Sequence, residues 1–111
     1  MKKVEAIIQP FEVEAVKEAL TQIIIKRMTV TEVKGFGGPT GPVEVYRGIR
    51  SEAPYHIEAK VEIIVPDDMA GKAVAIFRET TETEEPESER IFVSSLEDIN
   101  PLVTEKKRVA V

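Results

Sequence analysis

The chain has 111 residues, of which 42% are hydrophobic and 32% are charged, and this size and composition predict a single domain over residues 1–111. Cysteine is absent, which excludes disulfides and thiolate chemistry, and no run of about 18 apolar residues offers a membrane span, so we expect a cytoplasmic protein without membrane insertion. Twenty acidic residues against 15 basic ones give a net charge of −5, which argues against a nucleic-acid-binding surface because such a surface needs a basic stripe.

Two predicted strands flank a predicted helix in the first part of the chain. Alternation of apolar and polar residues predicts a strand over roughly residues 2 to 9, which Pro10 ends because proline cannot donate to a sheet. From Glu12 the apolar spacing becomes helical, and one face carries Val13, Val16, Leu20 and Ile23. Residues 28–36 are rich in β-branched side chains, so they predict the second strand.

A glycine- and proline-rich segment from Gly37 to about Tyr55 separates the second predicted strand from the third. Only residues 43–46 of this segment have an extended pattern. A loop of about 20 residues is uncommon inside a compact domain and is usually functional. We therefore expect a recognition loop here.

The second half of the chain repeats the strand and helix pattern. Residues 57–65 alternate as a strand, and Pro66 then opens a helix that we expect Asp67 or Asp68 to cap. The predicted buried stripe of this helix consists of Met69, Ala73, Ile76 and Phe77. A polar turn over residues 80–90 with five glutamates leads into a fourth strand over residues 90–95, and a tail over about residues 100–111 follows.

The order β-α-β-β-α-β predicts an α+β, ferredoxin-like sandwich with both helices on one face of the sheet. The opposite face would then present apolar side chains among charged ones. These residues are Ile7, Ile64 and Phe92 among Glu5, Lys60 and Glu62. Because contiguous exposed apolar area usually marks an interface, we expect a homo-oligomer.

Five segments of the sequence closely resemble the PII nitrogen-regulatory signal proteins, and the match runs from residue 1 to about residue 99. The segments are KKVEAIIQPF (2–11), MTVTEVKGFG (28–37), YRG (46–48), VPDD (65–68) and IFV (91–93). The resemblance implies a cytoplasmic homotrimer of ferredoxin-like subunits that binds ATP or ADP between subunits and 2-oxoglutarate through magnesium on ATP. It also implies that the long loop over about residues 37–55, the T-loop, docks on transporters and enzymes.

The phosphate-binding B-loop of the family is degenerate in this chain. In the family it reads Thr-Gly-x-x-Gly-Asp-Gly-Lys, whereas residues 83–90 here read TEEPESER, within a turn over about residues 82–90. Glu84, Glu87 and Glu89 stand where the family has glycines. Glycine lets backbone N–H groups close on phosphate oxygens, while a carboxylate brings like charge. ATP and ADP are therefore disfavoured, and no cofactor is certain.

Other ligand positions depart from the family in the same direction. Pro101 and Val103 replace two arginines that reach the phosphates, Pro39 replaces the glutamine that holds magnesium, and Glu58 replaces the lysine that grips 2-oxoglutarate. Arg27 replaces a glycine beside the adenine. The resemblance leaves a residual nucleotide cleft made of Ile7, Thr29, Gly35, Gly37, Glu62, Ile64 and Arg90.

The resemblance also assigns partner contacts to Tyr46, Arg47 and Gly48 in the T-loop. Arg47 matches the arginine that in family members enters an ammonium-transporter pore. Ser51 stands where a modifiable tyrosine would be, so nucleotidylylation at that site is excluded. Ile24 replaces a glycine after the first helix, and we expect a different helix end because β-branched residues disfavour the left-handed cap.

Our first hypothesis is a PII-like trimeric regulator that controls a transporter or metabolic enzyme through its T-loop, with nucleotide and 2-oxoglutarate binding weakened, lost or altered. One alternative is a ligand-independent structural or assembly trimer, or a heterotrimer partner of an ordinary PII subunit. Another is a sensor of a different small ligand such as bicarbonate, AMP or ADP. Catalysis and metal binding are disfavoured because His56 is the only histidine, no nucleophile has a base beside it, and the acidic run lacks calcium-loop spacing.

Overall fold

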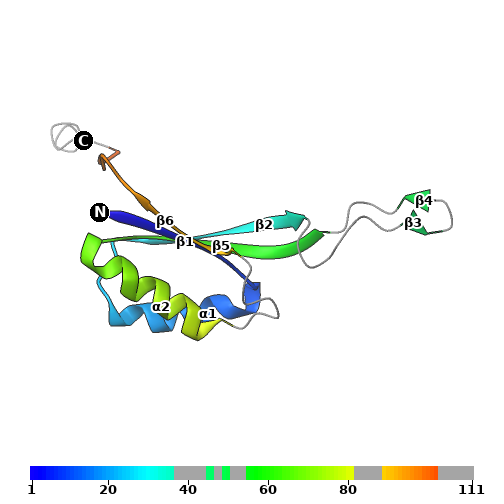
Figure 1. The fold of residues 1–111 in the computed structure, drawn as a ribbon, viewed down its shortest axis with the longest axis horizontal. Coiled ribbons are helices and arrows are strands. Elements are labelled where there is room, and N and C mark those ends of the chain that lie inside the picture. The colour runs from blue at the N-terminus through cyan, green and yellow to red at the C-terminus, as the bar shows by residue number, and fades with distance from the viewer. Residues whose placement is uncertain (37–44, 47–48, 51–54, 82–88, 103–111) are drawn as a thin grey trace, which may run out of the picture.

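A four-stranded antiparallel sheet is the centre of the fold (Figure 1). The computed structural model describes residues 1–36, 45–46, 49–50, 55–81 and 89–102. The strands are β1 (Lys2–Ile8), β2 (Met28–Phe36), β5 (Tyr55–Val65) and β6 (Ile91–Ser95), in the order β2-β5-β1-β6. The two longest strands, β2 and β5, pair over their shared length from Met28 opposite Ile63 to Phe36 opposite Tyr55.

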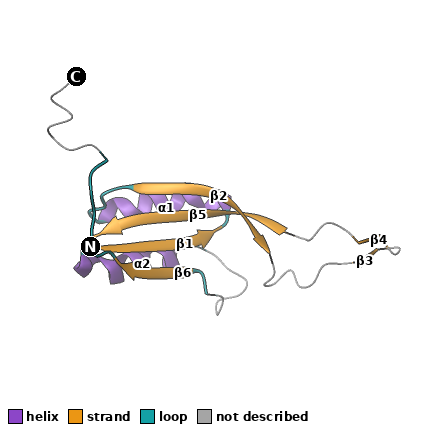
Figure 2. Ribbon diagram, turned by 90° about the horizontal axis from the view of Figure 1, so that it is seen from above, coloured by secondary structure: helices purple, strands orange, loops and turns teal. Residues whose placement is uncertain are grey.

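Both helices cover one face of this sheet (Figures 1 and 2). Helix α1 (Val13–Ala19) lies between the 3-10 turns η1 (Pro10–Glu12) and η2 (Leu20–Gln22), and α2 (Ala70–Thr80) follows the 3-10 turn η4 (Asp67–Met69). The largest fully buried side chains come from both the sheet and the helical layer: Phe77, Leu20, Ile63, Val4, Val16, Val61 and Val65. The predicted α+β ferredoxin-like architecture is confirmed.

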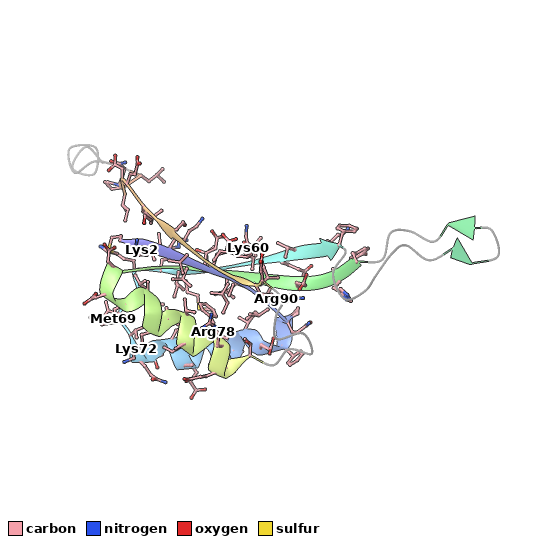
Figure 3. The ribbon with its side chains drawn as sticks, in the orientation of Figure 1. Lys2, Lys60, Met69, Lys72, Arg78 and Arg90 are labelled. Atoms are coloured by element: carbon pink, nitrogen blue, oxygen red, sulfur yellow. The ribbon has the colours of Figure 1, made fainter. Side chains whose placement is uncertain are left out.

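The other face of the sheet carries the predicted mixture of apolar and charged side chains. Along β5 the residues buried against the helices are Ala59, Val61, Ile63 and Val65, so the alternate residues point to the opposite face. We call that opposite side the open face, and Lys60 lies on it in Figure 3. Phe92, which lies opposite Glu5 on this face, is 46% exposed.

The third strand begins earlier than predicted. β5 starts at Tyr55, which the sequence assigns to the loop, because the Tyr55 ring packs 5.7 Å from the Phe36 ring between centroids and lies 4.8 Å from Lys34 Nζ. Within the predicted T-loop, β3 (Val45–Tyr46) pairs with β4 (Ile49–Arg50) beyond the end of the main sheet (Figure 1). Residues 37–44, 47–48 and 51–54 lie outside the described residues.

Helix α1 ends without a left-handed residue at its described cap positions. Leu20 has a φ of −69° and stays helical, and Ile23, after the 3-10 turn, is extended with a φ of −127°. Ile24 is 78% exposed beside this turn. Neither Leu20 nor Ile23 therefore needs the left-handed conformation that β-branched residues disfavour.

The predicted side-chain cap of the second helix is wrong. Neither Asp67 nor Asp68 caps it, because Pro66 starts a 3-10 turn that contains both aspartates and α2 begins only at Ala70. The Asp67 carboxylate instead accepts a hydrogen bond from the amino group of Met1, at 2.7 Å. This hydrogen bond and the positive charge of the amino group lower the pKa of Asp67.

We predict that this ion pair makes folding stability sensitive to acid. A carboxylate whose pKa is lower in the folded state contributes stability above its unfolded pKa, and that contribution is lost as the pH falls below about 4. Urea denaturation at pH 7 and pH 3 should therefore show a smaller acid loss for Asp67→Asn than for the wild type. Asp68→Asn, one residue along the same turn, is the control, and an Asp67→Asn variant as acid-sensitive as the wild type would contradict the assignment.

Candidate functional site

The described residues of the predicted nucleotide cleft lie on the open face. These residues are Ile7, Thr29, Gly35, Glu62, Ile64 and Arg90. Directly opposite residues in an antiparallel sheet point to the same face. Thr29 lies opposite Glu62, and Gly35 lies opposite His56, two residues before Glu58 on β5. Gly37, the remaining predicted member, lies outside the described residues.

Residues of β1 and the segment just before β6 also lie on this face. Ile7 lies opposite Lys60, and Ile64 lies opposite Lys3. The Ile7 N–H donates to the carbonyl of Arg90 at 2.9 Å, so the backbone just before β6 is fixed to β1. The structure thus brings residues that are far apart in the sequence onto one surface.

The Arg90 side chain is paired with a buried carboxylate. Arg90 Nη1 donates to Glu58 Oε2 at 2.5 Å, and the side chains of Glu58 and Arg90 are 9% and 27% exposed. Figure 3 labels Arg90 where the chain leads into β6. A carboxylate buried to this degree is stable only when it is paired, because burial removes its hydration. Arg90 therefore has a buried carboxylate as its partner in this structure.

Gly35 provides the space that the second oxygen of Glu58 occupies. A Cβ atom built on Gly35 would lie 1.8 Å from Glu58 Oε1 and 2.9 Å from its Cδ. Glu58 Oε1 therefore lies against the Gly35 backbone while Oε2 accepts from Arg90. Gly35 is required here for close approach of a side chain, not for an unusual φ.

The charges of the open face are balanced by carboxylates. Lys3 Nζ lies 3.2 Å from Glu62 and 3.7 Å from Glu5, and Lys60 Nζ lies 3.9 Å from Glu62. The hydrogen bond to Glu62 and the charge of that carboxylate raise the pKa of Lys3. Together with the Glu58 and Arg90 pair, each of these three cations on the described part of the face has a carboxylate partner.

The remaining predicted positions contribute less to the described site. Glu89 is exposed immediately before Arg90, and Pro101 is exposed after β6. Tyr46 lies in β3, where its backbone pairs with Ile49. Arg47, Gly48, Glu84, Glu87 and Val103 lie outside the described residues.

Among the described residues, no group of three or more histidine or acidic side chains could hold a metal ion. His56 is exposed on β5. No helix in the described part of the chain is long and apolar enough to cross a membrane.

Sequence reasoning identified Glu58 only as the loss of a ligand-binding lysine and did not pair it with Arg90. The available signal was the combination of an acidic residue at position 58 with the basic residue kept at position 90. The two residues are 32 positions apart, so only the strand order reveals their contact.

The fold defines a class of small α+β proteins in which a four-stranded antiparallel sheet carries both helices on one face. A family model described as Nitrogen regulatory protein P-II matches residues 1–106. The chain therefore belongs to the PII family, whose members are regulatory signal-transduction proteins and not enzymes.

Curated relatives agree with this assignment. The chain is 44% identical over 93 residues to Nitrogen regulatory protein P-II 1 of Escherichia coli, with 84% of this chain and 83% of the relative covered. It is 41% identical over 98 residues to Nitrogen regulatory protein P-II of Bradyrhizobium diazoefficiens, covering 88% of each chain. It is 37% identical over 107 residues to the protein of the same name from Azospirillum brasilense, covering 96% of each chain.

Proposed function

We propose that this protein is a cytoplasmic, trimeric PII regulator that controls a transporter or a metabolic enzyme through its T-loop, and whose binding of nucleotide and 2-oxoglutarate is weakened or lost. Family membership supports the regulatory role, and the relatives, which are named nitrogen regulatory proteins, support a role in nitrogen regulation. The T-loop residues Tyr46, Arg47 and Gly48 are the proposed contacts with the partner.

The pairing of Glu58 with Arg90 carries the proposal of altered ligand binding. Arg90 is the basic residue that the degenerate B-loop keeps, and its guanidinium already donates to a buried carboxylate. An incoming phosphate would have to displace that carboxylate or approach it as a like charge. Glu84, Glu87 and Glu89 add negative charge in the B-loop, and Pro101 and Val103 cannot replace the cationic side chains of the family.

The open face supports a trimer, and light scattering should give a mass of about three times the 12.4 kDa chain. Phe92→Glu would place a second carboxylate opposite Glu5 on this face, and we expect it to shift the protein to monomers. Ala75→Glu makes the same change of charge at an exposed position of α2 and should leave the trimer intact. A wild-type monomer, or equal behaviour of the two variants, would contradict this account.

Binding to an ammonium transporter from the same genome tests the regulatory role. We expect the purified protein to bind the detergent-solubilised transporter with an affinity that changes by less than about twofold when ATP and 2-oxoglutarate are added, about 0.4 kcal/mol. Arg47→Ala should weaken binding about tenfold or more, because a central arginine often dominates a contact. Arg78→Ala, an exposed arginine on α2 (Figure 3), is the control.

Release of the transporter by 2-oxoglutarate would contradict the proposal, because it requires a working ligand site. If the Arg47→Ala and Arg78→Ala variants bind the transporter equally strongly, Arg47 of the T-loop does not contribute to transporter binding, and this result would contradict the proposal. Absence of binding to the transporter would exclude this class of partner and leave metabolic enzymes to be tested in the same format.

A further inference from the structure

The Glu58 carboxylate has the surroundings of a bound anionic ligand. One oxygen accepts from an arginine at 2.5 Å, the other lies against a glycine backbone that has no side chain in the way, and the group is 9% exposed. Arginine and an open glycine backbone are the groups with which proteins commonly recognise carboxylates and phosphates. Here the chain itself supplies the anion.

The three residues that make this contact come from separate parts of the sheet. Gly35 is on β2, Glu58 is on β5, and Arg90 is fixed to β1 through the Ile7 N–H and leads into β6. The Glu58 carboxylate therefore contacts Gly35 on one side of β5 and Arg90 on the other side. Strand pairing fixes the backbone that carries Glu58 close to Arg90. The Glu58 carboxylate can therefore compete with a free anion for Arg90 at a high effective concentration.

We propose that Glu58 is a built-in anion that occupies Arg90 and the space beside Gly35, and so excludes carboxylate and phosphate ligands from this part of the open face. Glu58 is then a specificity-determining residue. The inference deepens the proposed function and rests on it in one respect, because both place the lost ligand site on this face. The further inference adds that the Glu58 carboxylate fills this site and that a substitution of Glu58 reopens it.

Titration with inorganic phosphate, and separately with succinate, tests this role in the full-length protein. The shifts of the Gly35 amide and the Arg90 guanidinium would be followed by NMR. Glu58→Gln keeps the size of the side chain and removes its charge, and we expect it to bind both anions about tenfold more tightly than the wild type, equivalent to about 1.4 kcal/mol.

Glu79→Gln is the matched control, since it removes the same charge at an exposed position of α2, on the other side of the sheet. It should leave anion binding at Gly35 and Arg90 close to the wild-type value. A double variant that carries Glu58→Gln and Arg90→Gln should lose the gain in anion binding expected for Glu58→Gln alone. Equal gains in anion binding for Glu58→Gln and Glu79→Gln would overturn the proposal, because they would show a general effect of charge.

Glu58→Asp provides a second test that does not depend on a neutral side chain being tolerated. It keeps the charge but withdraws the carboxylate by one methylene, so we expect a partial gain in anion binding at Arg90. No gain in either Glu58 variant would also overturn the proposal. The proposed function would survive that result, because its own tests are the trimer mass, transporter binding, and coupled binding of ATP and 2-oxoglutarate by the wild type.

Discussion

Gly35→Ala is expected to destabilise the folded protein by about 1–3 kcal/mol, because overpacking of a filled site forces neighbouring groups to move. The new Cβ would lie 1.8 Å from Glu58 Oε1, a distance that no relaxed contact allows. Glu58 would have to leave the space beside Gly35, and its pairing with Arg90 would be disturbed. Urea denaturation at fixed protein concentration measures the effect.

Gly71→Ala is the control for this substitution. Outside its chain neighbours and the adjoining backbone of its own helix, no atom lies within 4 Å of a Cβ built on Gly71, which is exposed in the first turn of α2. Alanine is the better helix former, so we expect this variant to be more stable than the wild type by about 0.5–1 kcal/mol. A loss of stability in Gly35→Ala together with a gain in Gly71→Ala would support the close contact at Gly35. Equal changes in stability would contradict it.

Arg90→Met is expected to destabilise the protein by about 1–3 kcal/mol, because it leaves the Glu58 carboxylate buried without its cation. The effect should be smaller than for a fully buried pair, since the Arg90 side chain remains 27% exposed. Methionine keeps much of the aliphatic packing of arginine, so the change reports mainly on the missing charge. Chemical denaturation at neutral pH is again the measurement.

Adding Glu58→Leu to Arg90→Met should recover most of the lost stability. A buried ion pair can often be replaced by apolar side chains of similar size at little cost, whereas removal of one partner is costly. The double-mutant cycle isolates the interaction between the two residues. Additive effects of the two substitutions would show that the contact contributes nothing, and would also weaken the proposed role of Glu58 as a built-in anion.

Much of the fold follows from local patterns in the sequence. The predicted second strand, residues 28–36, has the same bounds as β2, because its β-branched residues suit an extended conformation and Gly35 is accommodated by a specific contact. The start of β5 was predicted two residues late, since the packing of Tyr55 on Phe36 depends on strand pairing. The Asp67 cap was wrong because both aspartates lie within the 3-10 turn before α2, and the partner that Asp67 has instead, the amino group of Met1, is distant in the sequence.

The candidate site was predictable only in part. The half-apolar open face followed from alternation along the strands, as the placement of Ile7 and Ile64 opposite Lys60 and Lys3 shows. The contact between Glu58 and Arg90 could not be predicted from spacing, because it joins residues whose proximity depends on the strand order β2-β5-β1-β6. The proposed roles of Arg47 and of the B-loop glutamates rest on the family pattern and remain predictions.

Calorimetric titration of the purified wild-type protein with ATP, ADP and AMP, with and without magnesium and 2-oxoglutarate, tests the central claim most directly. With Arg90 committed to Glu58, we expect ATP and ADP dissociation constants above about 1 mM, which is a binding free energy no stronger than about −4 kcal/mol. We also expect no tightening of ATP binding by 2-oxoglutarate. Micromolar ATP binding that 2-oxoglutarate strengthens would contradict the account and identify a working PII sensor.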